Sequence, residues 1–464
     1  MRWVHSQKRR RAVSLLRQSG RLADLGRDEE ALPANEEAVI IYRELAAADP
    51  GTFRRGLAIS LDRLSLRLAD LGRREEALAA VKEAVTIYRE PRRGRPGRYP
   101  YLAAGLTNLS LRLADLGHEE EALAAVEEAV TIYREAAADS EFRPGLAWSL
   151  DGLSLRLAGA GREEEALAAI EEAVTIYRPL LAGGDEEVRH DFADALNTLA
   201  RRLVELRREH HALTPIDESV SIYRELAAAR PGAISRYLAT PLNTRSIILL
   251  RLGRQEEALA AIEEAVGIGR ELAAVNPGVG RPALALSLTR LSECLADLGR
   301  AGEALAAIDE AVTIYRDLAS ASPGAFRLGI AWSLARKMTC LVDLGRSEDA
   351  LVASDEAVGI YRELAAANPG GLGPGLAPLL YRQSDCLAEL GRPQEALAAA
   401  EEAIIIYREL AAVSPGPFGP DVAGSLDHLA ALLSALERDA EAEAARAEAA
   451  WLACAGTPLA CRSS

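Results

Sequence analysis

The sequence of 464 residues is poor in aromatic residues, in lysine and in cysteine. Phe, Trp and Tyr make up 5% of the chain, so its core must be built mainly from Ala, Leu, Val and Ile. Five cysteines in so long a chain exclude the dense disulfide framework of a small secreted protein. No apolar run approaches the roughly 18 residues of a membrane-spanning helix. We therefore expect no membrane partner.

Positive charge is also scarce. The chain has 54 basic and 69 acidic residues, a net charge of −15, which argues against a nucleic-acid partner because such proteins need a basic face. Residues 1–11 are basic, but they lack the apolar stretch and cleavage site of a secretory signal. Only three residues are Lys, whereas Ala, Gly and Arg are abundant. This composition predicts a bacterial, cytoplasmic protein.

What the sequence has in abundance is repetition. The string LADLG recurs, with variants, and we use its last residue as the marker of each repeat. The ten markers are Gly26, Gly72, Gly117, Gly161, Arg207, Gly253, Gly299, Gly345, Gly391 and Glu437, at intervals of 46, 45 and 44 residues and then 46 six times. Ten repeats therefore tile almost the whole chain and replace the roughly three domains that its length suggests.

Each repeat is predicted to form two helices. Before the marker, apolar residues recur at spacings of three and four, as in Leu57, Leu61, Leu64 and Leu68. The glycine then ends this first helix. After it, a stretch such as REEALAAVKEAVTIYREL begins with acids and is dense in helix formers. Pro-Gly pairs follow the second helix in many repeats and are expected to stop it. No segment has the pattern of a strand.

Small residues identify the type of repeat. Ala stands five residues after the marker in all ten repeats and twelve residues after it in nine, the exception being Ser219. This spacing of glycine and two alanines resembles the tetratricopeptide repeat (TPR) family over essentially the whole chain. The period of 46 residues exceeds that family's usual 34 or so, and in this the chain is similar to the longer repeats of kinesin light chains. HEAT and armadillo repeats have periods near 46 but do not explain the spacing.

The resemblance implies an all-α fold, a right-handed α-α superhelical solenoid of about ten TPR-like hairpins. We expect a single solenoid over residues 1–454 and a disordered tail over 455–464.

Two series of side chains recur with the repeat and have competing interpretations. The tyrosines Tyr42, Tyr88, Tyr133, Tyr177, Tyr223, Tyr315, Tyr361 and Tyr407 could form a stacking platform, but we expect them in the core between repeats, with hydroxyls that reach the surface. Cys294, Cys340 and Cys386 lie one repeat apart. Helix packing distances of 8–10 Å are too long for disulfides, and no His stands at ligand spacing, so these thiols are interpreted as semi-buried filling.

Signatures of catalysis are missing from the sequence. It contains no phosphate-binding G-x-x-x-x-G-K-[ST] motif, no H-E-x-x-H and no G-x-S-x-G. The Gly-rich run at 370–375 follows no strand and fits a loop between repeats. We therefore predict that the chain is not an enzyme and has no cofactor or metal site.

In the TPR-like arrangement, the first helices line a concave groove. Residues ten, six, three and two positions before the marker should face it. The candidate protein-binding residues are Asp62, Leu66, Asp70, Thr107, Leu111, Asp115, Asp151 and Leu155. They predict an apolar floor edged with acids, and hence a protein or peptide partner of apolar and basic character. As an alternative, the leucines pack between repeats, and Asp70 and Asp115 pair with Arg67 and Arg112.

Two segments depart from the repeat. Residues 91–100 form a basic loop that could take an anionic partner or simply be solvated. In the middle of the chain, Pro215 suits only a first turn, so the second helix of repeat five is expected to start near Thr214. Gly267 and Gly269 weaken the next second helix, and Gly269→Tyr is expected to raise stability. These features predict a soft joint over residues 205–270.

The function that fits these observations is a non-catalytic protein-protein interaction scaffold or adaptor that binds a protein segment in the groove. The alternative is a sensory or regulatory repeat array that controls a catalytic or signalling partner in trans. The sequence does not name the partner, because one fold can carry many functions.

Overall fold

The computed structural model describes residues 2–24, 27–90, 99–137, 139–229, 235–321, 326–367, 373–413 and 415–455. Over these residues the chain forms twenty α-helices and two short 3₁₀ helices, η1 (Ser140–Phe142) and η2 (Leu181–Gly183), and no strand. The expected all-α fold is therefore confirmed. The basic loop at 91–100 and the tail at 455–464 lie almost entirely outside the described residues, apart from Tyr99 and Pro100, which begin a helix, and Ala455, which ends one.

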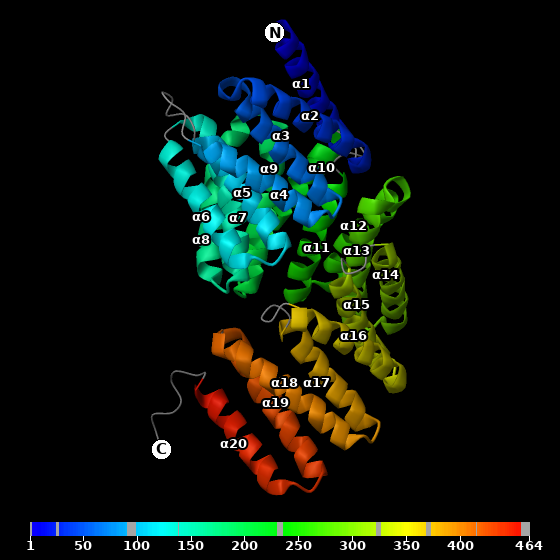
Figure 1. Cartoon of the computed structure of the whole chain (residues 1–464). Helices are drawn as coiled ribbons and strands as arrows, with labels where there is room; N and C mark the ends of the chain where they lie inside the picture. The colour runs from blue at the N-terminus through cyan, green and yellow to red at the C-terminus, as the bar shows by residue number, and fades with distance from the viewer. Residues whose placement is uncertain are drawn as a thin grey trace. The chain divides into compact units, whose positions relative to one another are not determined.

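The helices divide into two compact units, Met1–Leu252 and Gly253–Ser464, which we call the N-terminal and C-terminal units. The N-terminal unit contains α1 (Arg2–Asp24), α2 (Asp28–Ala48), α3 (Pro50–Asp70), α4 (Arg74–Arg89), α5 (Tyr99–Asp115), α6 (Glu119–Ala136), α7 (Arg143–Gly159), α8 (Glu163–Leu180), α9 (Glu186–Glu205), α10 (Glu209–Ala229) and α11 (Ser235–Arg251). The C-terminal unit contains α12 (Gln255–Val275), α13 (Pro277–Asp297), α14 (Ala301–Ala321), α15 (Arg327–Asp343), α16 (Ser347–Ala367), α17 (Gly373–Glu389), α18 (Pro393–Val413), α19 (Pro415–Ala435) and α20 (Asp439–Ala455). Odd-numbered helices are the first helices of the repeats and even-numbered helices the second, and within each unit consecutive helices pack side by side (Figure 1).

The turn between the two helices of a repeat has one geometry in repeats two to ten. In repeat two, the amide of Gly72 donates to the carbonyl of Ala69 (2.9 Å) and the amide of Arg73 to that of Leu68 (2.8 Å). Gly72 has a φ of 73°, in the left-handed region that glycine adopts without strain. Arg207 and Glu437 take the same conformation, with φ of 58° and 60°. Loss of the glycine therefore does not change these two turns.

This result corrects the expectation for repeat five. The second helix α10 begins at Glu209, not near Thr214, and Pro215 lies inside it as a buried residue. The amide of Arg208 donates to Leu203 O (2.8 Å), as the equivalent amides do in other repeats, so the turn sets where the helix begins. Pro215 then forfeits its one helical hydrogen bond, but the side chain is still buried in the core.

The Pro-Gly pairs also have a different role from the one expected. In the described residues, α2 ends at Ala48, and Pro50 is the first residue of α3. Pro277 and Pro415 likewise begin α13 and α19. Proline suits the first helical position because its missing N–H would have no partner there. These prolines therefore begin the first helix of the next repeat, as well as following the end of the previous one.

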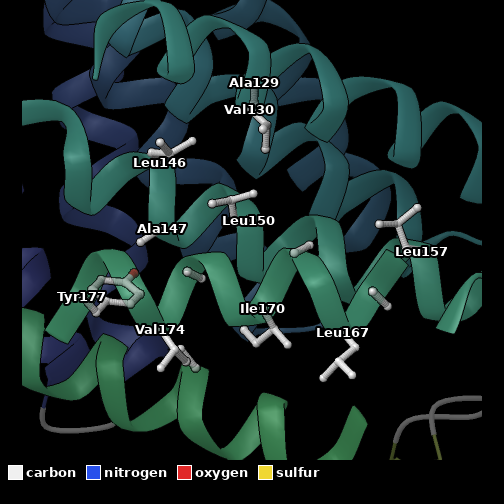
Figure 2. Packing of buried hydrophobic residues seen from close by; sticks show 14 of the residues in the cluster. Ala129, Val130, Leu146, Ala147, Leu150, Leu157, Leu167, Ile170, Val174 and Tyr177 are labelled. Carbon is white, nitrogen blue, oxygen red and sulfur yellow. The ribbon is translucent and has the colours of Figure 1, made fainter. Parts of the chain in front are cut away.

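The tyrosine series packs between repeats, as expected. All eight side chains are buried, with exposed fractions of at most 9%. A Cβ added at Gly56 would lie 2.3 Å from the ring of Tyr42, and one at Gly145 would lie 2.5 Å from that of Tyr133. Gly329 and Gly375 meet Tyr315 and Tyr361 in the same way, so at these four interfaces the tyrosine ring needs a glycine on the next first helix. Figure 2 shows the neighbouring core, in which Tyr177 of α8 lies with aliphatic side chains of α6, α7 and α8.

The interface between α12 and α13 has no tyrosine in this series, because Gly269 stands in its place. A Cβ at Gly269 of α12 would lie 3.0 Å from the Cα of Leu284 on α13, and one at Gly280 only 2.1 Å from the backbone nitrogen of Ala273. The backbones of α12 and α13 therefore approach closely at the position where other repeats hold a tyrosine. This corrects the expectation that Gly269→Tyr raises stability, because the ring has no room.

Ion pairs link successive second helices on the exposed side. An Arg seventeen residues after the marker lies next to a Glu eleven residues after the next marker. The pairs are Arg43–Glu83, Arg89–Glu128, Arg134–Glu172, Arg178–Glu218, Arg270–Glu310, Arg316–Glu356, Arg362–Glu402 and Arg408–Glu448, with N–O distances of 2.5–3.0 Å. Exposed pairs contribute only about 0–1 kcal/mol each, so they fix the register of the repeats more than they stabilise the fold.

Candidate binding groove

The first helices of the N-terminal unit form a continuous surface. Helices α3, α5, α7, α9 and α11 contact one another in that order. We call the side of the first helices that is turned away from the second helices the inner face. It is the surface on which the sequence analysis placed the groove.

The three leucines of the expected floor lie on α3, α5 and α7. Leu66, Leu111 and Leu155 are each half-buried. Among the described residues, none of the three belongs to a hydrophobic cluster, whereas the neighbouring Ala114 and Ala158 pack against the core. Since the leucines are not needed to fill the core, they can make apolar contacts to a ligand.

Asp62 lies beside these leucines in an unusual environment. The Tyr88 hydroxyl of α4 donates to Asp62 Oδ2 at 2.8 Å. Burial raises the pKa of Asp62 to about 7, and the bond from Tyr88 only partly opposes this. Asp62 Oδ1 is buried and has no hydrogen-bond partner among the described residues. The carboxyl group can therefore accept a further hydrogen bond.

Asp151 occupies the same repeat position on α7. Burial raises its pKa to about 6, and a hydrogen bond from Thr198 on α9 lowers it. Asp191 and Asp194 raise it further, and Arg201 opposes them. Asp151 Oδ1 is also buried without a partner among the described residues. Asp62 and Asp151 are thus desolvated acceptors at the same repeat position of α3 and α7.

Three residues next to Asp151 were not predicted from the sequence. His190, Asp191 and Asp194 lie on α9, and His190 Nδ1 is 3.6 Å from Asp194 Oδ2 and 3.7 Å from Asp191 Oδ1. The Tyr223 hydroxyl donates to Asp194 Oδ1 at 2.6 Å. Burial raises the pKa of Asp194, while His190 and Tyr223 lower it. The helical spacing, extended one turn before the position of Asp151, would have found Asp194.

The remaining candidate residues are less open to a ligand. Arg67 and Arg112 lie 3.2 Å from Asp70 and Asp115, so the ion pairs of the alternative interpretation are present. Thr107 is 1% exposed, donates to the Ala103 carbonyl and lies 2.8 Å from the Ser149 hydroxyl. Its hydroxyl is thus enclosed between helices and does not face the groove as expected.

The part of the chain that the structure describes contains no metal site, no disulfide and no helix that could span a membrane. No group of three or more His, Cys, Asp or Glu side chains there could hold a metal ion. Cys294, Cys340 and Cys386 are free thiols with exposed fractions of at most 2%, more deeply buried than expected. No described helix combines the length and the apolar character that crossing a bilayer requires.

Comparison with known proteins decides the family. A tetratricopeptide repeat family model matches residues 57–90 and 146–181. The model described as anaphase-promoting complex subunit 5 matches 3–49, 93–154, 188–276, 281–332 and 381–413, together more than half of the chain. The chain belongs to the tetratricopeptide repeat family. The subunit 5 model is the one that matches more than half of the repeats' sequence. The resemblance to the tetratricopeptide repeat family seen in the sequence is confirmed.

Solved structures show the same fold. A Rap protein complexed with Competence and Sporulation Factor has a TM-score of 0.57 and 13% identity, covering 87% of this chain and 99% of that one. The apo form of RapI has a TM-score of 0.56 and 14% identity, covering 86% and 98%. Nearly identical TPR-like repeats of a putative kinesin light chain from Podosopora anserina have 20% identity and a TM-score of 0.37, covering 48% and 99%. A search of curated proteins finds no match.

The two Rap structures confirm the expected fold class, a solenoid of TPR-like hairpins. Repeats of this family generally serve as scaffolds for protein interaction, which fits a chain without catalytic motifs. The matches do not choose a partner or a site.

Proposed function

We propose that this TPR protein is a non-catalytic scaffold or adaptor that binds a protein segment along the inner face of its N-terminal unit. The observation that carries the proposal is the row of half-buried leucines, Leu66, Leu111 and Leu155, which lie outside the core. The desolvated carboxyl groups of Asp62 and Asp151 stand one helical turn before Leu66 and Leu155.

The chemistry of this face selects the partner. Apolar side chains of a ligand would cover the leucines and remove apolar area from water. Basic groups of the ligand would donate to Asp62 and Asp151, whose Oδ1 atoms are buried acceptors without partners among the described residues. A segment that alternates apolar and basic residues satisfies both. We propose that the ligand is such a protein segment and that the protein does not bind nucleic acid.

One solved neighbour supports a ligand-binding role for this fold. The Rap protein of that structure is complexed with Competence and Sporulation Factor, and it covers 87% of this chain. The same neighbour favours a second candidate, a regulatory array that controls a catalytic or signalling partner in trans. In either role the protein is proposed to have no cofactor. The cytoplasmic location and bacterial origin stay predictions from composition.

The test uses two fluorescein-labelled octapeptides, one of alternating Leu and Lys and one in which Glu replaces Lys. The variant Leu66→Ser/Leu111→Ser/Leu155→Ser should weaken binding of the Leu–Lys peptide at least about tenfold, because three apolar contacts are lost. Far-UV circular dichroism should show unchanged helicity.

The matched control is Ile40→Ser/Val352→Ser/Ile405→Ser, which removes three exposed apolar side chains from second helices. It should bind the Leu–Lys peptide as the unaltered protein does. Equal loss in both variants, or collapse of helicity in the leucine variant, would refute the groove.

A further inference from the structure

Two first helices of the C-terminal unit carry exposed apolar side chains. Leu286 of α13 is 37% exposed and Leu328 of α15 is 49% exposed. In the described part of the unit, neither packs against a hydrophobic cluster. Large apolar side chains in a row on a surface mark interaction sites more often than isolated ones do.

These side chains belong to one patch. Arg290 follows Leu286 by one turn of α13, and Trp332 and Arg336 follow Leu328 at successive turns of α15. The guanidinium of Arg290 lies 4.4 Å from the centre of the Trp332 ring, so the two helices are joined through these residues. The patch is therefore apolar at its Leu286 and Leu328 end and cationic at the other.

The two guanidinium groups at the cationic end share one carboxylate. Arg290 Nη1 lies 2.9 Å from Glu293 Oε2, and Arg336 Nε lies 3.4 Å from Glu293 Oε1. Glu293 is the one carboxylate that the described residues place within 4 Å of either guanidinium. Asp297 lies farther away, although Arg336 lowers its pKa against the effect of burial. Arg336 Nε is buried and makes no hydrogen bond to a described residue.

We propose that the patch formed by Leu286, Arg290, Leu328, Trp332 and Arg336 docks a partner segment in which a large apolar side chain lies next to a carboxylate. The apolar side chain covers Leu286, Leu328 and the Trp332 ring, and the carboxylate accepts from Arg290 and Arg336. The charge preference is the reverse of that of the N-terminal unit.

The patch shares with the proposed function only the assumption that the first helices bind protein segments. It uses different residues, in a different unit, and needs an acidic ligand instead of a basic one. The two proposals can therefore fail separately, and one pair of peptides tests both.

The experiment titrates the full chain with the labelled Leu–Glu and Leu–Lys octapeptides and follows fluorescence anisotropy. Arg290→Gln/Arg336→Gln should weaken binding of the Leu–Glu peptide about tenfold or more, because charge-assisted hydrogen bonds are lost. Leu286→Ser/Leu328→Ser should weaken it similarly. The matched control Arg270→Gln/Arg316→Gln, which alters two exposed ion pairs on second helices, should leave it unchanged.

Charge reversal gives a positive readout that misfolding cannot mimic. Arg290→Glu/Arg336→Glu should lose the Leu–Glu peptide and bind the Leu–Lys peptide more tightly. The proposal is overturned if the Arg→Gln variant binds the Leu–Glu peptide as before, or if the Leu–Lys peptide is the one whose binding depends on Leu286 and Leu328.

Further outcomes distinguish the two proposed binding sites from each other and a partner segment from a second copy of this chain. If the variant lacking Leu66, Leu111 and Leu155 binds the Leu–Glu peptide normally, the acidic ligand occupies the C-terminal unit, as proposed. If that variant loses the peptide, the assignment to this patch is wrong. Concentration-dependent dimerisation in sedimentation that is abolished by Leu328→Ser would make a second copy the occupant and would also refute it.

Discussion

Replacing Gly280 by alanine is expected to destabilise the C-terminal unit, although alanine is the better helix former. The added Cβ would lie 2.1 Å from the nitrogen of Ala273 and 2.3 Å from the carbonyl carbon of Leu272. Both are backbone atoms of α12, so only separation of α12 from α13 relieves the clash. Overpacking costs about 1–3 kcal/mol, against a gain of about 1 kcal/mol from helix propensity. The expected result is a net loss of up to about 2 kcal/mol.

Gly267→Ala is the matched control, because Gly267 lies on the same α12 and no atom comes within 4 Å of its added Cβ. It should gain about 1 kcal/mol. Urea unfolding followed by far-UV circular dichroism measures both variants, and hydrogen exchange across α12 and α13 locates the change. Equal stability of the two variants would refute the close approach of these helices.

Three other predictions concern the middle of the chain and the N-terminal unit. Burial raises the pKa of Asp62 to about 7 and of Asp151 to about 6, so the folded state binds more protons than the unfolded state. The free energy of unfolding should therefore rise as pH falls from 8 towards 5. Asp62→Asn/Asp151→Asn should flatten this rise, as measured by urea titrations. Arg207→Gly should stabilise the chain by about 1 kcal/mol, because φ is 58° and a side chain strains the left-handed region; no change in the melting temperature would count against strain at this turn. Hydrogen exchange should be faster across residues 205–270 than in the repeats on either side, and uniform protection would remove the predicted soft joint.

The repeat period made most of the fold predictable. A pair of helices that recurs about every 46 residues with the same glycine and alanines packs against its neighbours in the same way each time. The packing predicted for one repeat therefore applies to the others. Single departures from the repeat were predicted less well. Pro215 was expected to delay α10, but a turn formed by Arg207 had already set where the helix begins.

The candidate site was predictable only where it follows the helical spacing. Asp62 and Asp151 were found because they stand ten residues before a marker. The burial of Thr107 was not predicted, because this burial depends on contact with Ser149 of the neighbouring helix. The stacking of Arg290 on Trp332 was not predicted either, because the two residues are 42 positions apart in the sequence and lie in different repeats.

The pairing of tyrosine with glycine across repeats constrains how such an array can lengthen or shorten in evolution. At four interfaces a tyrosine of one repeat meets a glycine of the next, and two of these interfaces flank repeat eight. Removing repeat eight would therefore bring Tyr315 against Gly375 in place of Gly329 and restore the same fit. The same deletion one repeat earlier would bring α12, which holds Gly269, against Gly329 of α15. Neither helix would then supply a ring, and a void the size of a tyrosine side chain would remain. Repeat eight can therefore be lost without changing the fit of its neighbours, whereas the α12–α13 interface is inherited as one piece.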